Sequence, residues 1–569
     1  MNFSKKILAQ TVTQLCIAKE IGHVVISPGS RNAPLIIGFT EHPYFNDYSI
    51  VDERCAAFFA VGMAKQLGKP VALVCTSGSA LLNYYPAVAE AFYSDIPLVV
   101  ISADRPAHLI DIGDGQTIRQ ENVFAGHILY SANCREGAKH QDFNESEINS
   151  ALNTAIEHNG PVHINIPFSE PLYEMTDVSV TPKNVAAILA YDTSNSSNDI
   201  LTDMITSEID SEALLSFKDN WDTAKRKMIL VGTLPPNSIE QKYIDVLAED
   251  ESVIVLTETT SNLYHEYFFP AIDQLIAPLD EKESKKLQPD LLLTFGGMIV
   301  SKKIKTFLRD YPPGSHYHID PKKALDTFFV LTSHLQTQIS IFLNWLTIDY
   351  KQVKSHYRKE WLIIKEHRLQ RHSLYEGQIP FSDFKVFSEV FENLPQNIQL
   401  QLSNSTAIRY AQLFHLHRNI GVFCNRGTSG IDGSTSTAIG AAVVSKLPTV
   451  LITGDLSFLY DSNALWNNYI PKHFKIIIIN NSGGGIFRIL PGAKDMSNFK
   501  RFFETRHGLT AEHLCKMYDL DYLSVNNAGS LEGALTEFFK SSEKPKLLEI
   551  FTPAEVNDTV LLEYFDFIK

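Results

Sequence analysis

Residues 454–487 have the sequence GDLSFLYDSNALWNNYIPKHFKIIIINNSGGGIF, and its pattern of polar and apolar residues predicts the fold. The apolar run before Gly454 and the run at 475–480 indicate two strands, with a helical segment between them. Asp455 and Asn481 therefore stand at the ends of strands that we expect to be neighbours in a parallel sheet. A carboxylate together with amide and backbone oxygens forms a site for a hard cation, and Mg²⁺ held in this way usually keeps phosphate oxygens as further ligands.

The helix expected after Gly454 would add to such a site. The backbone N–H groups of Leu456 and Ser457 lie in its first turn and would face the same phosphate. The simpler alternative is an aspartate that caps a helix, followed later by a glycine-rich turn. Asp455 alone would favour that alternative, but the Asn-Asn-Ser-Gly sequence at the next strand end favours a cation and a diphosphate.

Short runs rich in Val, Ile and Leu alternate with helical segments along most of the chain. Continuous apolar strands of this kind are typical of parallel sheets covered by helices on both faces, so the predicted fold class is α/β with doubly wound parallel sheets. The expected strands comprise residues 23–27, 71–77, 96–104, 162–167, 227–232, 253–258, 291–297, 398–403, 421–425, 449–455, 475–480 and 546–551.

Two breaks divide the 569-residue chain. We interpret the polar stretch at about 178–200 as a linker and the charged stretch at 349–372 as a solvated connecting helix. The result is three α/β domains, at residues 1–180, 195–350 and 375–569. Polar and glycine-rich turns follow the strands mainly in the first and third domains, so we expect the chemistry to lie between these two.

Composition excludes some classes of function. The net charge of −15 argues against sequence-independent binding of nucleic acid, which needs a basic face. The six cysteines are scattered without a CxxC pair, so we expect buried thiols and neither a zinc site nor a disulfide framework. The N-terminus does not resemble a signal peptide and no apolar run is long enough for a membrane span, which predicts a cytoplasmic protein.

The spacing from Gly454 to Asn481 resembles the GDG-x(24–27)-NN signature of thiamine diphosphate enzymes, with Leu456 in place of the second glycine. The likeness covers essentially the whole chain and implies a pyrimidine-binding, a central and a diphosphate-binding α/β domain. It implies thiamine diphosphate as cofactor and Mg²⁺ or Mn²⁺ as metal, bound by Asp455, Asn481 and the carbonyl of Gly483. The cofactor contacts that it implies in the third domain are Gly454, Asp455, Leu456, Ser457, Ile431, Asn481, Gly483, Ile486 and Phe487.

Glu53 follows a short apolar run and opens an Ala-rich helix, where a buried carboxylate would need a partner. By the resemblance, Glu53 hydrogen-bonds N1′ of the cofactor's aminopyrimidine and favours the imino tautomer that activates the thiazolium. Without that context, a glutamate at a helix start is more often a partner of the helix dipole.

Ile431 resembles the bulky residue over which the cofactor bends, and its alternative is an ordinary core isoleucine. In this family the cofactor lies between Glu53 of one chain and the Asp455 site of another, which implies a homodimer or homotetramer.

Several basic residues stand at predicted strand ends, an arrangement that suits bidentate capture of carboxylates. Each of them alone is more readily explained as a surface or structural residue. They are Arg31, Arg54, Arg105, Arg409 and Arg426, with Lys302 in the middle domain.

Four motifs narrow the resemblance: SPGSRNAPL, ADRPAHLIDIGDGQTIRQ, CNRGTSGIDGSTSTAIG and GDLSFLYDSNALW. They are similar to the branch of the family that decarboxylates 2-oxoglutarate and adds the succinic-semialdehyde carbanion to isochorismate, on the route to menaquinone. Both substrates are dicarboxylates.

The likeness also assigns roles to single residues. On the isochorismate side it places Ser30, Arg31, Gln116 and Arg105, with Lys302 reaching in from the middle domain. It gives the succinyl carboxylate to Ser405 and Arg409, and places Arg426 near both substrates. The catalytic candidates are thus Glu53, Ser30, Arg31, Gln116, Arg409 and Arg426, and the substrate-binding candidates are Arg105, Lys302 and Ser405. The branch commonly has Lys-Arg at positions 302 and 303, whereas this chain has Lys303 at the second position. A lysine cannot bind both oxygens of a carboxylate in the bidentate way of an arginine, which puts a role for Lys303 in doubt.

Two alternatives stay open. One is another thiamine enzyme, such as an acetohydroxyacid synthase or a 2-oxoacid decarboxylase. The sequence shows neither the His-His pair common in those decarboxylases nor a sign of the flavin site of those synthases, and no catalytic histidine stands out. The other is a non-catalytic protein that kept the fold, which the presence of Glu53 and of the metal ligands disfavours.

Overall fold

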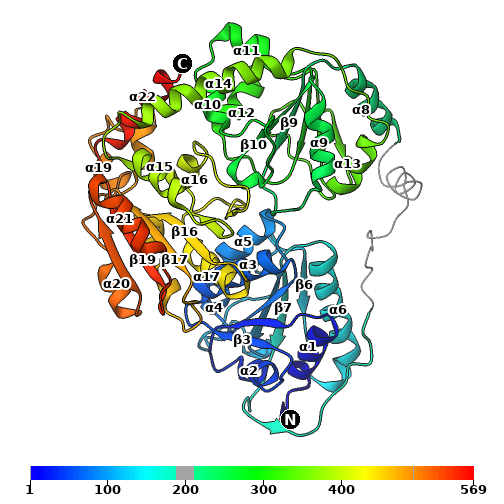
Figure 1. Ribbon diagram of the computed structural model, residues 1–569. Coiled ribbons are helices and arrows are strands. Elements are labelled where there is room, and N and C mark those ends of the chain that lie inside the picture. Colours follow the sequence, from blue (N-terminus) through cyan, green and yellow to red (C-terminus); the bar gives the residue numbers. More distant parts are fainter. Residues whose placement is uncertain (1, 187–210, 491) are drawn as a thin grey trace.

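The computed structural model describes residues 2–186, 211–490 and 492–569, and these form three α/β domains (Figure 1). Each domain is built on one fully parallel sheet, which confirms the predicted fold class. Neighbouring residues of a strand enter different cores: Val24 packs in one apolar cluster of the first domain and Val25 in another. Both faces of that sheet are therefore buried, as the continuous apolar strands predicted.

The N-terminal sheet has the strand order β3-β2-β4-β5-β7-β6. Its strands are β2 (His23–Ile26), β3 (Asn46–Ser49), β4 (Val71–Cys75), β5 (Leu98–Asp104), β6 (Tyr130–Asn133) and β7 (Val162–Pro167). Its helices are α1 (Ile7–Ala18), α2 (Ala33–Thr40), α3 (Glu53–Leu67), α4 (Ser79–Asn83), α5 (Tyr85–Tyr93) and α6 (Gln141–Glu157). A separate antiparallel pair joins β1 (Phe3–Ser4) to β8 (Met175–Thr176).

The central sheet has the order β10-β9-β11-β12-β13. Its strands are β9 (Lys227–Val231), β10 (Val253–Thr257), β11 (Leu291–Phe295), β12 (Ser315–Ile319) and β13 (Ser333–Leu335). Its helices are α8 (Ser211–Thr223), α9 (Gln241–Glu249), α10 (Ile272–Ile276), α11 (Glu281–Leu287), α12 (Lys302–Asp310) and α13 (Ile339–Thr347).

The C-terminal sheet has the order β15-β14-β16-β17-β19-β18. Its strands are β14 (Gln399–Leu402), β15 (Gly421–Cys424), β16 (Thr449–Gly454), β17 (Lys475–Asn480), β18 (Asp521–Val525) and β19 (Lys546–Phe551). Its helices are α15 (Asp383–Asn393), α16 (Thr406–Ala411), α17 (Ser434–Val444), α18 (Asp455–Tyr460), α19 (Phe499–Phe502), α20 (Glu512–Met517), α21 (Ala528–Phe539) and α22 (Asn557–Phe567).

Every strand expected from the sequence is present, but several others were missed. Most of the missed strands, β3, β6, β13 and β18, lie at the edges of their sheets. Their sequences are short and polar, for example NDYS in β3, because an edge strand of a parallel sheet is only partly buried. The inner strand β12, SHYHI, was missed because its two histidines interrupt the apolar run.

The expectation of a solvated connecting helix at 349–372 is wrong in part. A helix is present as α14 (Tyr357–Glu376), but one of its faces is buried and includes Trp361 and Arg368. The Tyr357 hydroxyl donates to the carbonyl of Leu287 in the central domain, and the Tyr375 hydroxyl donates to the carbonyl of Val560 in α22. The helix therefore packs against the central and C-terminal domains and links them.

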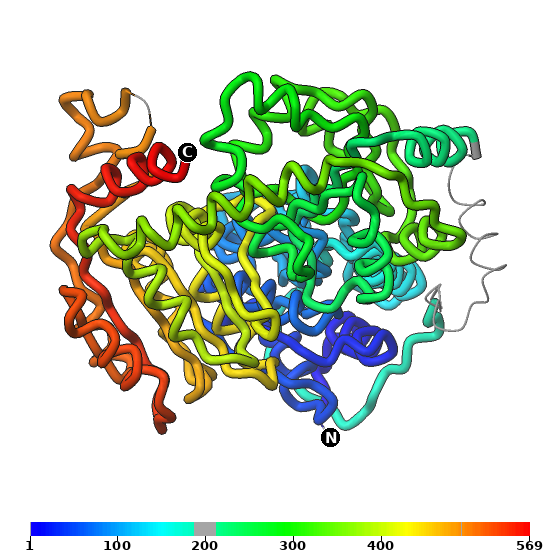
Figure 2. Tube along the Cα trace, turned by 45° about the horizontal axis from the view of Figure 1, so that its top comes forward, coloured from blue at the N-terminus to red at the C-terminus, as the bar shows by residue number. Residues whose placement is uncertain are grey.

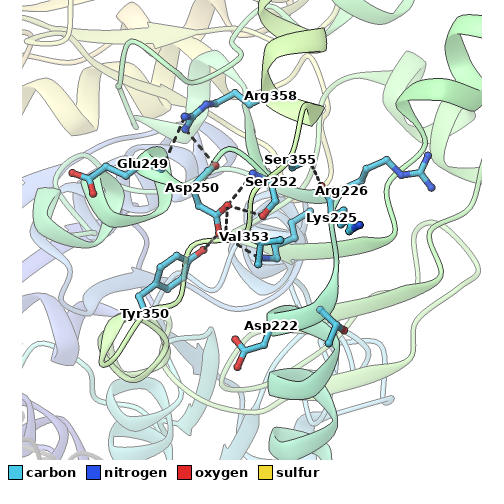
Figure 3. A network of polar contacts seen from close by, with 12 residues as sticks. Asp222, Lys225, Arg226, Glu249, Asp250, Ser252, Tyr350, Val353, Ser355 and Arg358 are labelled. Atoms are coloured by element: carbon cyan, nitrogen blue, oxygen red, sulfur yellow. Dashed lines mark hydrogen bonds and ion pairs between the residues drawn. The ribbon is translucent and has the colours of Figure 1, made fainter.

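The segment before α14 is attached to the central domain by a buried carboxylate (Figure 3). Asp250 accepts hydrogen bonds from the backbone and hydroxyl of Ser252 at 2.8 and 2.6 Å and from the Tyr350 hydroxyl at 3.0 Å. Its ion-pair partner is Lys227, 3.3 Å away, and neither side chain is exposed to solvent. Burial lowers the pKa of Lys227, while Asp250 counteracts that effect.

Of the predicted linker at 178–200, residues 187–200 lie outside the described residues. The part before them lies against α6, where Glu145 accepts the backbone N–H groups of Lys183 and Asn184 at 3.0 and 2.9 Å. The domain boundaries at 180, 195, 350 and 375 stay predictions.

Helices α3 and α17 hold the N-terminal and C-terminal domains together, and the yellow segments lie against the blue domain in both views (Figures 1 and 2). They cross at two glycines. A Cβ atom at Gly62 would lie 2.0 Å from the carbonyl oxygen of Thr437, and one at Gly440 would lie 2.0 Å from that of Phe59. Only glycine fits at either position, so the two backbones are in direct contact.

Candidate functional site

The third domain gathers the predicted cation ligands at the ends of two neighbouring strands. Strands β16 and β17 pair in parallel, and Asp455 and Asn481 directly follow them. Both side chains are buried, with 4% and 6% of their surface exposed. Asp455 accepts the backbone N–H of Leu456 at 2.7 Å and that of Gly483 at 2.9 Å. The carboxylate thus ties the start of α18 to the glycine turn after β17.

Asn481 provides an unpaired hydrogen-bond acceptor next to Asp455. Its Nδ2 donates to Asp383 at 2.8 Å, whereas its Oδ1 is buried and has no hydrogen-bond partner among the described residues. Burial raises the pKa of Asp383 to about 6. Leaving a buried acceptor unpaired costs free energy, and a hard cation would satisfy it. The residues present therefore fit a divalent cation.

The turn after β17 requires glycine at position 483. Its φ of +146° is rarely adopted by other residues, and a Cβ there would lie 2.4 Å from the backbone oxygen of Glu504. The following turn contains Ile486 and Phe487, both half-buried, and Phe487 packs edge-on against Phe503 with ring centroids 5.9 Å apart.

Sequence reasoning missed a histidine at this site. Nε2 of His507 lies 3.2 Å from the Asp455 carboxylate, and the nearness of this carboxylate raises the pKa of the imidazole. His507 stands in an irregular segment between α19 and α20, so no periodicity or strand-end rule pointed to it.

The loop 425–433 borders the same site. Ser457, in the first turn of α18, donates its hydroxyl to the carbonyl of Ile431 at 2.7 Å. Ile431 is 37% exposed, which is unusual for an isoleucine in a folded domain and contradicts its alternative as a core residue. A Cβ at Gly433 would lie 2.2 Å from the ring of Phe58 in α3, so the loop packs directly on the helix that Glu53 opens.

Glu53 is the first residue of α3 and is half-buried. The Asn83 amide donates a hydrogen bond to its carboxylate at 3.3 Å. The helix start is held from the C-terminal domain: Asp52 accepts the Asn463 amide at 2.8 Å, and the Cys55 thiol donates to Asp461 at 3.6 Å. Burial raises the pKa of Asp461 to about 6.

The structure does not bring Glu53 and the cation ligands together by direct contact. Among the described residues, no hydrogen bond or ion pair joins Glu53 to Asp455, Asn481 or Gly483. The two halves of the predicted cofactor site are each formed within this chain, on different domains.

The predicted isochorismate-side residues lie in the segments that follow β2 and β5. Arg105 donates to the carbonyl of Gly115 at 2.9 Å and so brings Gln116 to the strand ends. The Ser77 hydroxyl donates to the carbonyl of Gln116 at 3.0 Å. Ser30 is exposed at the same edge.

Arg31 and Arg54 are partly used by structural contacts. Arg31 is buried, donates to the carbonyl of Phe168 at 2.8 Å and pairs with Glu170 at 3.1 Å. Arg54 donates to the carbonyl of Tyr460 at 2.7 Å and lies 4.0 Å from Asp461, so it joins the two domains.

A second basic group forms in the C-terminal domain after β14 and β15. Ser405 adopts a positive φ of +72° and precedes α16, which carries Arg409. Arg426 donates to Asn404 Oδ1 at 2.7 Å. The Nε atoms of Arg409 and Arg426 are buried without a hydrogen-bond partner among the described residues. The arginine ion pairs of the same residues all involve other arginines. Burial, together with the charge of Arg426, lowers the pKa of Arg409.

The central domain reaches this group through α12. Lys302 is exposed at the start of the helix, and Lys303 lies over the ring of Phe565 at 5.7 Å, so Lys303 packs against α22. Lys305, which sequence reasoning missed, is half-buried and its pKa is lowered by burial and by Arg426. Its spacing of three from Lys302 on one helix was the available signal.

Glu258 holds the start of α12 in place. Its buried carboxylate accepts the backbone N–H of Val300 at 2.8 Å and that of Ser301 at 2.7 Å. Burial raises the pKa of Glu258 to about 7, although these hydrogen bonds counteract it.

Of the described residues, no helix is both long and apolar enough to cross a membrane.

Comparison with known proteins agrees with this geometry. Three family profiles match in order: "Thiamine pyrophosphate enzyme, N-terminal TPP binding domain" over residues 7–125, "Middle domain of thiamine pyrophosphate" over 204–402, and "Thiamine pyrophosphate enzyme, C-terminal TPP binding domain" over 405–550.

Curated relatives extend the likeness over the whole chain. The chain is 54% identical to the 2-succinyl-5-enolpyruvyl-6-hydroxy-3-cyclohexene-1-carboxylate synthase of Christiangramia forsetii, over 100% of both chains. It is 55% identical to the protein of the same name from Flavobacterium psychrophilum, over 99% of both chains. The corresponding protein of Porphyromonas gingivalis is 38% identical, over 100% of this chain and 98% of its own.

Proposed function

Because the chain belongs to the thiamine pyrophosphate enzyme family and, within it, to the 2-succinyl-5-enolpyruvyl-6-hydroxy-3-cyclohexene-1-carboxylate synthases, we propose that it decarboxylates 2-oxoglutarate and transfers the succinic-semialdehyde unit to isochorismate. The reaction makes it a transferase of menaquinone biosynthesis. Thiamine diphosphate, when bound, supplies the electron sink that decarboxylation of a 2-oxo acid needs.

The observation that carries the substrate assignment is the pair Arg409 and Arg426. Both side chains are half-buried, each has a buried Nε without a hydrogen-bond partner, and the arginine ion pairs of the described residues involve other arginines. A partly buried cation without an ion-pair partner is costly, and a carboxylate that binds each planar guanidinium through two hydrogen bonds would satisfy it. Arg409, with Ser405, would hold the distal carboxylate of 2-oxoglutarate, and Arg426 would lie beside both substrates.

The first domain would receive the second substrate. Ser30 and Arg31 follow β2, Arg105 and Gln116 follow β5, and only β4 lies between these strands; together they carry the donors that a dicarboxylate acceptor requires. Lys302 and Lys305 would approach from α12. Lysine is a point charge that cannot fork a carboxylate, so these two would contribute attraction more than orientation.

The cation site would hold Mg²⁺ or Mn²⁺ through Asp455, Asn481 and the Gly483 carbonyl, with the diphosphate on the N–H groups of Leu456 and Ser457. The unpaired Oδ1 of Asn481 supports this assignment. Glu53 would hold a proton at N1′ of the pyrimidine, and Ile431 would support the bend of the cofactor through its exposed side chain.

A homodimer or homotetramer would complete the site. Glu53 and Asp455 lie on different domains without contact within one chain, and apolar residues near each are exposed. Val51 and Leu82 lie beside Glu53, Tyr460 ends the helix that begins at Asp455, and Trp466 follows that helix. We propose that a second copy covers them, so that Glu53 of one copy faces Asp455 of the other. A cytoplasmic location and the absence of nucleic-acid binding stay predictions from the sequence.

The test is an assay with purified protein, thiamine diphosphate and Mg²⁺, with each component omitted in turn. Loss of isochorismate absorbance that requires both substrates and the cofactor would support the synthase. Faster turnover of pyruvate than of 2-oxoglutarate, or decarboxylation unaffected by isochorismate, would favour another thiamine-dependent decarboxylase or carboligase instead.

A further inference from the structure

A carboxylate of the N-terminal domain binds the loop of the C-terminal domain that carries Arg426 and Ile431. Glu90 lies on α5 and is 1% exposed. Its Oε1 accepts the backbone N–H of Gly427 at 2.7 Å, and its Oε2 accepts the backbone N–H and the hydroxyl of Thr428 at 2.7 and 2.9 Å. Ser94, which directly follows α5, donates its hydroxyl to Oε1 at 2.9 Å.

The contact is tight enough to fix the loop. A Cβ at Gly427 would lie 2.5 Å from the backbone oxygen of Glu90 and 2.8 Å from the Ser94 hydroxyl, so only glycine fits against α5. Among the described residues Glu90 forms no ion pair, and the donors to its carboxylate are the loop and Ser94. Charge-assisted hydrogen bonds of this kind are shorter and stronger than neutral ones.

The residues fixed by this contact are those of the proposed active site. Arg426 immediately precedes Gly427, and Ile431 follows three residues after Thr428. From the other side, Asn404 donates its amide to the carbonyls of Asn425 and Gly430, both at 2.7 Å. Glu90 and Asn404 therefore hold the loop from two domains, and Arg426 lies between their contacts.

We infer that Glu90 is a positioning residue: through Gly427 and Thr428 it sets the place of the Arg426 guanidinium for substrate carboxylate binding. The expected effect of Glu90 on catalysis rests on the proposed function. The expected effect of Glu90 on the position of the loop does not depend on that function.

Glu90→Gln is the sharpest perturbation. A glutamine has nearly the same shape, but one of its two terminal atoms is an amide NH₂, and each carboxylate oxygen of Glu90 now faces a backbone N–H. In either amide orientation a donor meets a donor, so one of the two loop contacts is lost. Glu145→Gln is the matched control, because Glu145 is also 1% exposed and accepts two backbone N–H groups, but far along the chain from this loop.

Hydrogen exchange of the full chain, with thiamine diphosphate and Mg²⁺ bound, measures the protection of the loop amides directly. We expect at least one of the amides of Gly427 and Thr428 to exchange at least about tenfold faster in Glu90→Gln, and both to be unchanged in Glu145→Gln. Wild-type exchange at both amides in Glu90→Gln would overturn the inference, whatever the activity. If Glu90→Gln does not fold, Thr428→Val removes a single hydroxyl donor, and faster exchange at the Thr428 amide would support the same conclusion, while unchanged exchange would contradict it.

Kinetics then separate positioning from a general structural effect. The KM for 2-oxoglutarate should rise about tenfold in Glu90→Gln, equivalent to about 1.4 kcal/mol, and stay at the wild-type value in Glu145→Gln. Combined with Arg426→Lys, Glu90→Gln should add less than its own effect, because both act on one guanidinium, whereas Glu145→Gln should leave the effect of Arg426→Lys unchanged. Full additivity of Glu90→Gln and Arg426→Lys would refute the positioning role. A wild-type chain that makes no product would refute the proposed function alone, since the exchange result would still stand.

Discussion

Replacing Gly62 with alanine should force apart two helices that now touch. The new methyl would lie 2.0 Å from the carbonyl oxygen of Thr437 and 2.9 Å from the backbone nitrogen of Ala441. A carbon needs about 3.3 Å from a carbonyl oxygen, so α3 and α17 would have to separate by about 1.3 Å at this point. Both obstacles are backbone atoms of α17, which cannot rotate away as a side chain would.

The cost can be estimated from similar changes. Overpacking a core costs about 1–3 kcal/mol, and we expect the upper end because backbone must move. Alanine recovers about 0.5–1 kcal/mol over glycine within a helix. The net loss is then about 2 kcal/mol, which lowers the Tm of a domain of this size by about 4–8 °C.

Differential scanning calorimetry at fixed protein, cofactor and metal concentration would measure this shift. Gly533→Ala is the control, because Gly533 also lies in a helix, α21, but a Cβ there meets nothing within 4 Å. That variant should melt at the wild-type temperature or slightly above it. If Gly62→Ala melts no lower than Gly533→Ala, the backbones of α3 and α17 are not in direct contact at Gly62.

Four further outcomes are expected. Glu53→Gln should bind thiamine diphosphate with near wild-type affinity by fluorescence titration but lose about 10²–10⁴-fold in turnover, and unchanged turnover would dismiss the role at N1′. Arg409→Lys should raise the KM for 2-oxoglutarate about tenfold or more, because lysine keeps the charge but not the fork; an unchanged KM would remove Arg409 from substrate binding. The folded-state pKa of Glu258, about 7, lies above its ordinary value of 4.5, so its contribution to stability is complete below about pH 4.5 and is lost as pH rises toward 7. The Tm of wild type relative to Glu258→Gln should therefore fall from pH 5 to pH 7 and level off above, and a difference independent of pH would contradict the raised pKa. Trp466→Glu should shift the protein toward monomer in sedimentation velocity and reduce activity per chain, whereas an unchanged assembly would place the interface elsewhere.

The parts of the site that follow one strand could be predicted from the sequence. Asp455 and Asn481 each stand directly after an apolar strand, and parallel strands bring their carboxyl ends to one edge. The same rule found Ser30, Arg105, Ser405 and the other turn residues, because local periodicity decides where a strand ends.

Contacts between domains could not be predicted in this way. Nothing in the sequence around Glu90 pairs it with Gly427, which is more than three hundred residues away and is brought near by domain packing. The same holds for Gly62 against Thr437. Lys305 was missed because the charges that act on it, Glu258 of its own domain and Arg426 of another, are far from it in the sequence, and His507 because it lies in an irregular segment.

The polar edge strands that escaped prediction protect the protein from joining other chains by strand addition. An edge strand offers unpaired N–H and C=O groups, and an apolar one would be a template for aggregation. β3 instead exposes Asn46, Asp47 and Ser49, and the Ser49 N–H is already taken by the Tyr469 hydroxyl at 2.8 Å. β18, at the edge of the C-terminal sheet, is likewise short and exposes Asp521. At these two edges, the polar residues that weakened the strand signal in the sequence are those that make pairing with a strand of another chain unfavourable.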